Sequence, residues 1–515
     1  MTACIDAEFG SIPDLIHQHA LHAPQRRALV LGERSLDYAA LDALMDCSAA
    51  ALQRDGIRAG QSIAICAATS IEYAAIFLGA LRAGVAVAPL APGSGAQSLQ
   101  RMLQDAQAQL LFTDAANAES FDASGPDAVA RVALDGSNIA RTLNDWLGAA
   151  DQKPEPVALQ RDWPFNIIYS SGTTGEPKGI VQSHAMRWSH VRRGATYGYG
   201  ADTVTLLSTP LYSNTTLVVF FPTLGFGGSV VLMPKFDALG YMELAQRERV
   251  THTMLVPVQY QRLLAHPQFD RFDLSSYRMK FSTSAPFAAA LKADALKRWS
   301  GELVEFYGMT EGGGTCILEA RAWPDKLHTV GRPAEGHDMR LIDDQGVEVA
   351  AGEIGEVVGH SGGMMLGYHG QPEKTREAEW FDPQGKRFIR TGDVGRFDAD
   401  GFLTLIDRKK DMLISGGFNV YPSDLEAVLR QHPRVLEVAV VGTPSAQWGE
   451  TPEAFVVLKA GPALAQDELL QWANAQLGRT QRLSRLHVLD ALPRSAIGKV
   501  LKRELRESWA AHESS

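Results

Sequence analysis

The sequence predicts an α/β protein in which a large N-terminal part is followed by a small, separate α+β domain. The chain has 515 residues, more than one hydrophobic core ordinarily serves, so at least two domains are expected. Helical and strand periodicities alternate from residue 11 to 308, which indicates parallel strands joined by crossover helices. Short, glycine-rich strand patterns replace this alternation between residues 327 and 405, which indicates an antiparallel, barrel-like subdomain.

Bulk composition argues against several classes of protein. A net charge of -10 does not suit a general nucleic-acid binder, because no basic face is implied. The four cysteines, Cys4, Cys47, Cys66 and Cys316, form no C-x-x-C pair, so neither a zinc site nor a disulfide framework is expected. The first residues do not have the pattern of a secretory signal, and no apolar run approaches the roughly 20 residues of a membrane helix. We therefore expect a cytoplasmic protein without a membrane span.

The spacing of apolar residues divides the alternating region into helices and strands. Ser11 is a candidate helix N-cap with Pro13 in the first turn, and Gly32 with Glu33 marks a hairpin. Helices are expected over residues 11–20, 38–52, 73–83, 185–197, 241–249 and 288–299. Strands are expected over residues 27–31, 34–38, 60–66, 85–90, 165–169, 179–181, 203–210, 228–233, 253–257, 277–282 and 303–307.

The C-terminal third has a different pattern. Strands are expected over residues 338–342, 354–358 and 402–406, without a long helix among them. A polar run from Asp407 then leads into a pair of glycines and a helix over residues 423–431. About a hundred residues of alternating helices and strands follow, which predicts a small independent α+β domain.

Residues 167–184, IIYSSGTTGEPKGIVQSH, form a strand, a donor-rich loop and a second strand. Glycines allow several backbone N–H groups to converge, the hydroxyls add donors and Lys178 adds a positive charge, which suits a polyphosphate. A Walker A loop would place its lysine between glycine and a hydroxyl residue and continue into a helix. Here Lys178 lies between Pro177 and Gly179 and a strand follows, so that interpretation fails. A simple surface hairpin remains the alternative.

Five motifs in this order resemble the adenylate-forming superfamily of acyl-CoA synthetases, firefly luciferase and peptide-synthetase adenylation domains. They are SSGTTGEPKG (170–179), FYGMTEGG (306–313), TGD (391–393), DRKKDMLISGGFNVYP (407–422) and PRSAIGKV (493–500). The resemblance implies an adenylation domain over residues 1–408, with two doubly wound α/β subdomains and a β-rich subdomain at 327–405. It further implies a mobile C-terminal lid domain over residues 409–515.

By this resemblance the loop holds the β- and γ-phosphates of ATP, while Tyr307 stacks on adenine. The implied phosphate contacts are Ser170, Ser171, Gly172, Thr173, Thr174, Gly175 and Lys178. Thr310 would meet a phosphate oxygen, and Glu311 would hold magnesium, which needs only one or two carboxylates beside phosphates. Gly308, Ser284 and Ala285 complete the implied nucleotide site. The alternative for Tyr307 and Glu311, a packed aromatic and a solvated acid, is less favoured because the flanking motif is present.

The remaining implied roles lie further along the chain. Asp393 offers paired acceptors to the ribose hydroxyls, with Arg408 beside them, although a turn-capping aspartate would also suit T-G-D. Lys499 would serve the substrate carboxylate and the α-phosphate as catalytic lysine; a solvated surface lysine is the alternative. Lys410 would be the hinge of the rotating lid. Gly416 and Gly417 would then approach the pantetheine arm of coenzyme A.

The acid-binding pocket departs from that of familiar relatives. Many aryl and fatty acyl-CoA synthetases carry a histidine where this chain has Ser213, and His184 and His190 nearby are equally explained by helix packing. Residues 212–221 contain no acid, which disfavours amino-acid substrates because a buried ammonium would lack a counter-charge. An uncharged tail is therefore expected. Candidate wall residues are Tyr212, Asn214, Thr215, Val256, Ser284, Gly312, Gly313 and Gly314.

The sequence therefore indicates an ATP-dependent carboxylic acid–CoA ligase that forms an acyl-adenylate and then a thioester, releasing AMP and pyrophosphate. ATP, Mg²⁺ and coenzyme A are the expected cofactors, and the expected partners are small molecules with the chain as monomer or homodimer. The expected acid is an aryl or arylpropenoic acid, or a medium-chain fatty acid. An amine or carrier-protein thiol as acceptor is the alternative. A phosphate-loop ATPase or kinase releasing ADP is the alternative from another class.

Overall fold

The computed structural model describes residues 5–121, 129–149, 151–170, 178–409, 411–415, 418–445, 449–462, 464–478, 481–495 and 499–513. The chain divides into two compact units, which are treated separately below. The first unit comprises Met1–His328, Pro333–Asp338 and His360–Ile389. The second comprises Thr329–Arg332, Met339–Gly359 and Arg390–Ser515.

An eight-stranded sheet in the first unit has the order β19-β9-β8-β4-β3-β5-β6-β7. Its strands are β3 (Ser62–Cys66), β4 (Ala86–Pro89), β5 (Ala108–Thr113), β6 (Arg131–Ala133), β7 (Arg141–Thr142), β8 (Pro164–Ser170), β9 (Lys178–Ser183) and β19 (Gly367–Tyr368). Its helices are α3 (Tyr38–Arg54), α4 (Ile71–Arg82), α5 (Ala96–Asp105) and α6 (Leu143–Leu147). Strands β8, β4, β3, β5, β6 and β7 pair in parallel, as the alternation predicts, whereas β9 runs antiparallel to β8.

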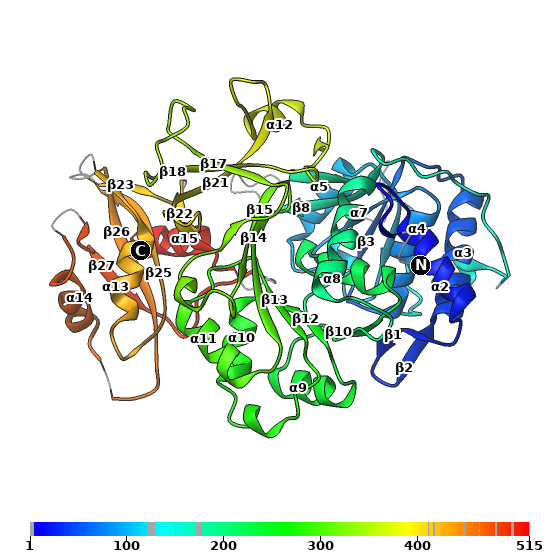
Figure 1. Cartoon of the computed structure of the whole chain (residues 1–515), viewed down its shortest axis with the longest axis horizontal. Coiled ribbons are helices and arrows are strands. Elements are labelled where there is room, and N and C mark those ends of the chain that lie inside the picture. Colours follow the sequence, from blue (N-terminus) through cyan, green and yellow to red (C-terminus); the bar gives the residue numbers. More distant parts are fainter. Residues whose placement is uncertain are drawn as a thin grey trace. The chain divides into compact units, whose positions relative to one another are not determined.

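A nine-stranded sheet of order β16-β15-β14-β13-β12-β10-β11-β1-β2 forms the other half of this unit (Figure 1). Its strands are β1 (Arg27–Leu31), β2 (Arg34–Asp37), β10 (Val204–Leu207), β11 (Ser229–Leu232), β12 (His252–Leu255), β13 (Met279–Ser282), β14 (Glu302–Met309), β15 (Gly312–Glu319) and β16 (Arg332–Pro333). Its helices are α2 (Ile12–His22), α7 (His184–Arg193), α8 (Asn214–Gly225), α9 (Ala238–Arg247), α10 (Pro257–Leu264) and α11 (Ala289–Arg298). Strands β1, β11, β10, β12, β13 and β14 are parallel, so their carboxyl ends share one edge.

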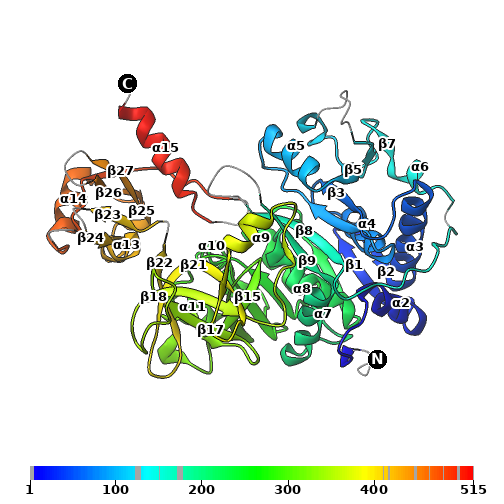
Figure 2. The ribbon, with the colours of Figure 1, turned by 90° about the horizontal axis from the view of Figure 1, so that it is seen from above.

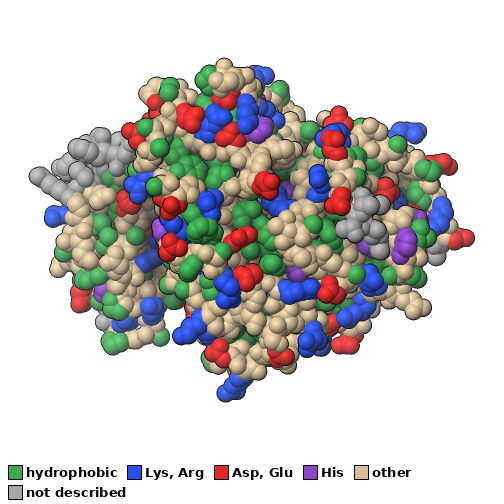
Figure 3. Space-filling model, viewed as in Figure 1, with side chains coloured by type: hydrophobic (Ala, Val, Ile, Leu, Met, Phe, Trp, Pro, Cys, Tyr) green, Lys and Arg blue, Asp and Glu red, His purple; other side chains and the backbone are tan. Residues whose placement is uncertain are grey.

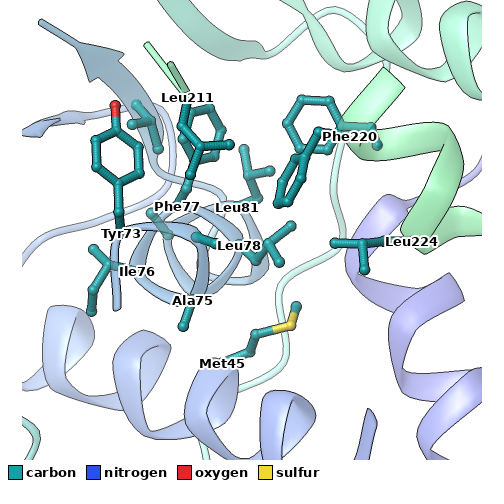
Figure 4. Packing of buried hydrophobic residues seen from close by; sticks show 14 of the residues in the cluster. Met45, Tyr73, Ala75, Ile76, Phe77, Leu78, Leu81, Leu211, Phe220 and Leu224 are labelled. Atoms are coloured by element: carbon teal, nitrogen blue, oxygen red, sulfur yellow. The ribbon is translucent and has the colours of Figure 1, made fainter. Parts of the chain in front are cut away.

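Helix caps and apolar faces explain why these segments fold as they do. The Ser11 side chain accepts a hydrogen bond from the Asp14 N–H at the start of α2, as predicted, and Ser70 caps α4 in the same way. Helix α4 is buried on almost every face, and Figure 4 shows its residues Phe77, Leu78 and Leu81 close to Phe220 and Leu224 of α8. This packing joins the two sheets through one apolar cluster.

The second unit contains short antiparallel strands followed by an α+β module (Figure 2). The first group is β17 (Asp338–Ile342), β18 (Gly355–His360), the later part of β21 (Arg387–Phe397) and β22 (Leu403–Arg408). The module contains β23 (Leu413–Ser415), β24 (Phe418–Val420), α13 (Pro422–Arg430), β25 (Val435–Ser445), β26 (Gly449–Leu458), α14 (Gln466–Asn474), β27 (Arg485–Val488) and α15 (Lys502–Glu513). Leu425, Val440 and Val456 belong to a core of its own, so the α+β prediction is confirmed here.

The fold class read from the sequence is thus confirmed, while the boundary at residues 408 and 409 stays a prediction. The expected helices and strands appear within a few residues of their predicted ends, and the apolar stretch 215–224 lies within α8. The glycine-rich region contains only one short helix, α12 (Pro372–Glu377). None of the described helices is long and apolar enough to cross a membrane. Basic and acidic side chains are interspersed over the face shown in Figure 3.

Candidate active site

The predicted phosphate loop connects two paired antiparallel strands. Ser170 at the end of β8 pairs with Lys178 at the start of β9, so the chain returns as a strand and the exclusion of a Walker A helix is confirmed. The Tyr169 hydroxyl, one residue earlier, donates to Asp105 Oδ2 at 2.6 Å, which fixes the end of β8 against α5. Five predicted phosphate contacts lie outside the described residues: Ser171, Gly172, Thr173, Thr174 and Gly175.

Lys178 and Glu311 are brought to opposite sides of one tyrosine. Strand β19 pairs antiparallel with β9, which places Tyr368 opposite Ile180. The Lys178 Nζ lies 5.1 Å from the centroid of the Tyr368 ring, and the Tyr368 hydroxyl donates to Glu311 Oε1 at 2.9 Å. Burial, and then the neighbouring Glu311 carboxylate, raise the pKa of Tyr368, so it remains a donor at neutral pH. Sequence reasoning missed Tyr368, whose role depends entirely on this strand pairing.

Thr310 and Glu311 form the turn of the β14–β15 hairpin. Met309 pairs with Gly312 across this turn, and Tyr307 pairs with Cys316 further down the hairpin. Gly312 has a φ of +86°, and a Cβ added there would collide with the carbonyl oxygen of Gly363. The motif thus requires glycine at this position for backbone reasons. It presents polar groups at the carboxyl edge of the parallel strands, as the sequence predicts.

A buried chain of hydrogen bonds supports the same turn from behind. Arg187 Nε donates to Asn166 Oδ1 at 2.9 Å, Asn166 Nδ2 donates to Gln182 Oε1 at 3.0 Å, and Gln182 Nε2 donates to the Thr310 carbonyl at 2.6 Å. The side chains come from α7, β8 and β9, so the strands flanking the phosphate loop are coupled to the turn. The Met365 N–H donates to the Glu311 carbonyl at 2.8 Å and completes the support. No sequence motif predicts this role for Asn166, Gln182 or Arg187.

The predicted ribose contacts lie together within the second unit. Asp393 pairs with Arg408 between β21 and β22, and Arg408 Nε lies 3.1 Å from Asp393 Oδ1. The backbone N–H of Asp393 donates to Thr391 Oγ1 at 3.0 Å, and the Thr391 hydroxyl donates to the Val357 carbonyl at 2.8 Å. Thr391 therefore caps this segment, and the Asp393 carboxylate is turned toward the arginine.

Lys499 closes a short loop of the second unit. Its N–H donates to Ser495 Oγ at 3.2 Å, while the Ser495 N–H donates to the Lys499 carbonyl at 2.8 Å. These bonds hold the backbone at the predicted catalytic lysine. The predicted hinge Lys410 and the pantetheine-facing Gly416 and Gly417 lie outside the described residues.

Two of the predicted acid-pocket residues, Asn214 and Gly312, line a cavity of about 300 Å³ in the first unit. Helix α7, the start of α8, the β14–β15 hairpin and residues 361–363 surround it. The cavity adjoins the Thr310–Glu311 turn through Gly312. It is therefore a candidate site for the part of the acid that follows the reacting carboxylate.

The other predicted pocket residues lie in neighbouring loops. Thr215 Oγ1 and Ser284 Oγ share a hydrogen bond of 2.6 Å, and Ser284 has a φ of +79°, an uncommon value for a residue with a side chain. Ala285 follows it between β13 and α11, Gly313 and Gly314 continue the hairpin, and Val256 precedes α10. Burial, and then the Cys66 thiol, raise the pKa of Tyr212 to about 12. The N–H of the preceding Leu211 donates to Thr69 Oγ1 at 3.2 Å, so this segment lies against the loop that follows β3.

The two histidines discussed from the sequence, His184 and His190, have different surroundings. The ring of His184 packs edge-on against Phe165 with centroids 5.0 Å apart, and burial lowers its pKa to about 4. His190 lines the cavity, with its Nδ1 3.4 Å from Arg187 Nη1. Helix packing therefore explains His184 but not His190.

Comparison with known proteins shows the family and the fold of this chain. A family described as AMP-binding enzyme matches residues 16–369, and one described as AMP-binding enzyme C-terminal domain matches residues 424–499. A feruloyl-CoA synthase of an Amycolatopsis species is 33% identical over 498 residues, covering 96% of this chain and 98% of its own. A long-chain-fatty-acid–CoA ligase of Mycobacterium tuberculosis is 32% identical over 514 residues, with the same coverage.

Among solved structures, that of ATP-bound MatB from Rhodopseudomonas palustris aligns with a TM-score of 0.84 at 29% identity, covering 96% of this chain and 99% of that chain. Fold and site together define an adenylate-forming enzyme with a large N-terminal and a small C-terminal domain. The chain belongs to the AMP-binding enzyme family, in its group of AMP-forming acid–CoA ligases.

Proposed function

We propose that the protein joins an aryl or arylpropenoic acid, or a medium-chain fatty acid, to coenzyme A through an acyl-adenylate. The carboxylate attacks the α-phosphorus of ATP, pyrophosphate leaves, and the thiol of coenzyme A then displaces AMP. The observation that carries this proposal is the Lys178–Tyr368–Glu311 cluster, which connects the end of the phosphate loop to the only acid in the Gly-Met-Thr-Glu turn.

The two charged residues of the cluster have different proposed roles. Lys178 supplies a positive charge where the β- and γ-phosphates leave, and fixed donors of this kind stabilise charge that develops on a leaving group. Within the described part of the chain no three His, Cys, Asp or Glu side chains gather as a metal site. Glu311 would therefore hold Mg²⁺ together with phosphate oxygens of ATP, as this ion prefers, and the ion would neutralise phosphate charge there.

The remaining assignments follow from the resemblance to the adenylate-forming superfamily and suit the chemistry of the residues. Tyr307 would stack on adenine, with Gly308, Ser284 and Ala285 around it, and Thr310 would contact phosphate. Asp393 would accept hydrogen bonds from the ribose, held in place by Arg408. Lys499 would neutralise the substrate carboxylate and the α-phosphate as the new bond forms.

The test is incubation with ATP, Mg²⁺, coenzyme A and a panel of aryl and alkyl acids, followed by separation of the nucleotide products. We expect AMP, pyrophosphate and an acyl-CoA. Release of ADP would show a kinase or ATPase instead. Formation of AMP that does not respond to coenzyme A, with release of an acyl-adenylate, would show that another acceptor, an amine or a carrier-protein thiol, is used.

A further inference from the structure

The cavity beside the β14–β15 hairpin has an unusual wall for an apolar acid. Helix α7 lines it from Ala185 to Arg193 and, together with His337, contributes arginine and imidazole groups. The described lining residues are Glu8, Arg161, Ala185, Met186, Trp188, Ser189, His190, Arg192, Arg193, Asn214, Met309, Gly312, Thr315, His337, Ser361, Gly362 and Gly363. Gly312 of this lining directly follows Glu311, so we expect the reacting carboxylate beside Gly312 and the rest of the acid along the other lining residues, which include Arg193.

Among the described residues, no carboxylate forms an ion pair with Arg192 or Arg193 at the end of α7. Among the described residues that line the cavity, Glu8 is the only carboxylate; its side chain is 82% exposed and binds Arg161 at 2.9 Å. Arg193 is half-buried, and within the described part of the chain no carboxylate pairs with it. A half-buried charge without a counter-charge lowers the stability of the fold, and a ligand oxygen bound to Arg193 would offset that loss.

Other basic side chains near the cavity also lack an acidic partner among the residues that the structure describes. Arg187, behind the cavity wall, is fully buried, and its guanidinium lies over the rings of Phe165 and Phe221 rather than against an acid. Burial, and then the charges of Arg193 and Arg187, lower the pKa of His190; burial and Arg193 lower that of His337 to about 4. At neutral pH the imidazoles of His190 and His337 are therefore uncharged. The positive charge beside the cavity comes from Arg187 and Arg193.

Three buried polar atoms in this region make no hydrogen bond: Arg187 Nη2, Asn214 Oδ1 and His337 Nδ1. Asn214 and His337 line the cavity itself. Buried polar groups are almost always paired, and each unpaired one costs free energy comparable to a lost hydrogen bond. A ligand atom able to hydrogen-bond inside the cavity would pair with Asn214 Oδ1 and His337 Nδ1.

We propose that the acid substrate carries an oxygen group at the end remote from its reacting carboxylate, and that Arg193 binds this oxygen with Asn214 and His337 as further partners. This inference rests on the proposed ligase function and narrows its substrate class. It selects acids with a distal hydroxyl or carboxylate and rejects purely apolar tails. A hydroxyl would accept from Arg193 and donate to Asn214 Oδ1, whereas a carboxylate would neutralise the arginine.

The test compares acids that differ only at the distal end. The first series is 3-phenylpropenoic acid with a methyl, hydroxyl or carboxylate group at the para position. The second series is octanoic acid, which ends in a methyl group, and octanedioic acid, which ends in a carboxylate. Pyrophosphate release gives kcat/KM for each acid with the wild-type chain, Arg193→Met, Arg193→Lys and Arg262→Met. Arg262 is an exposed arginine of α10 outside this cavity, so its variant controls for the loss of one surface charge.

We expect wild-type kcat/KM to be at least about tenfold higher for an oxygen-ended acid than for its methyl-ended match, because a site built for a polar group rejects the analogue that lacks it. Arg193→Met should abolish this ratio and Arg193→Lys should retain part of it, while Arg262→Met leaves it unchanged. The ratio is internal to each variant, so partial misfolding does not alter it. Preference for the hydroxyl or for the carboxylate identifies which oxygen is bound.

Two negative results have separate meanings. Equal or better use of methyl-ended acids by the wild-type chain, or a ratio that survives Arg193→Met, overturns the oxygen-binding inference and leaves the ligase proposal standing. Absence of AMP with every acid of both series overturns the ligase proposal itself.

Discussion

A single phenol joins the two halves of the candidate phosphate site. Tyr368 contacts Lys178 with its ring and Glu311 with its hydroxyl, so it orients the carboxylate without adding a charge. A hydrogen bond to a charged group contributes about 1.5–3 kcal/mol, which is more than the ring contact alone supplies.

Tyr368→Phe should therefore lower the rate of adenylation about tenfold and raise the Mg²⁺ concentration needed for half-maximal activity, with little effect on thermal stability. Pyrophosphate release measured against Mg²⁺ concentration reports both effects. Tyr38→Phe is the matched control, because the Tyr38 hydroxyl bonds the carbonyls of Leu224 and Gly228 away from the site. That variant should lose stability and keep its Mg²⁺ dependence; an unchanged Tyr368→Phe enzyme would refute the orienting role.

A second residue-scale consequence concerns His184 and pH. Burial of the ring lowers its pKa in the folded protein from the ordinary 6.5 to about 4. Between these two values only the unfolded chain binds the proton, so acidification from pH 6.5 toward 4 should destabilise the fold by about 1.4 kcal/mol per pH unit from this group. Above pH 6.5 the group has no effect.

The variant His184→Phe isolates that contribution. His184 Nε2 is buried without a partner and the ring faces Phe165, so an apolar ring should be accepted at pH 7. Urea unfolding midpoints at pH 7, 6 and 5 should fall less steeply for the variant than for the wild-type chain. Parallel pH profiles would show that His184 is protonated equally in both states.

At the scale of the element, the β14–β15 hairpin presents the Thr310–Glu311 turn and forms one wall of the cavity. Its geometry is set by Gly312, which combines a left-handed backbone with close approach to Gly363. Both the proposed phosphate contacts and the proposed acid-binding cavity therefore depend on one position without a side chain.

Gly312→Ala should cost both backbone strain and a steric collision, and should reduce adenylation together with thermal stability. Gly352→Ala separates the two costs, because Gly352 has a φ of +85° but open space where a Cβ would lie. The control should lose only about 1–3 kcal/mol of stability from strain and keep its activity. Equal losses in melting temperature and pyrophosphate release for both variants would rule out the collision.

Local pattern was sufficient for much of this architecture. Strands β8 and β9, the β1–β2 hairpin and the α2 cap follow from nearest-neighbour chemistry, and the sequence predicts all of them. Tyr368 and the Asn166–Gln182 pair were not predictable in this way. Their roles arise from contacts to Glu311 and Thr310 across 57 and 128 positions of the chain, which only the sheet order determines. The charged lining of the cavity could not be predicted for the same reason. Arg193 and His337 are far apart in the sequence, and only the packing of α7 brings both of them to the cavity.

At the scale of the whole molecule, the proposed catalytic lysine of adenylation, Lys499, belongs to the second unit. Lys499→Ala should slow acyl-adenylate formation at least a hundredfold, because a developing negative charge loses its partner in a water-poor site. Thioester formation from a supplied acyl-adenylate and coenzyme A should be spared. Single-turnover assays of each half-reaction make the comparison, with Lys459→Ala as a control on the same unit; equal loss in both would exclude the assigned role.

The two-residue strand β19 has a further effect on the molecule as a whole. Leu366 N–H and His369 N–H donate to the Val181 and Gly179 carbonyls, so this segment covers one side of β9. Without it, a hydrophobic strand edge would face water and could pair with the same edge of another copy. If the segment that carries Tyr368 shields this edge from other copies, insertions there should reduce soluble yield before they reduce the activity of the molecules that fold.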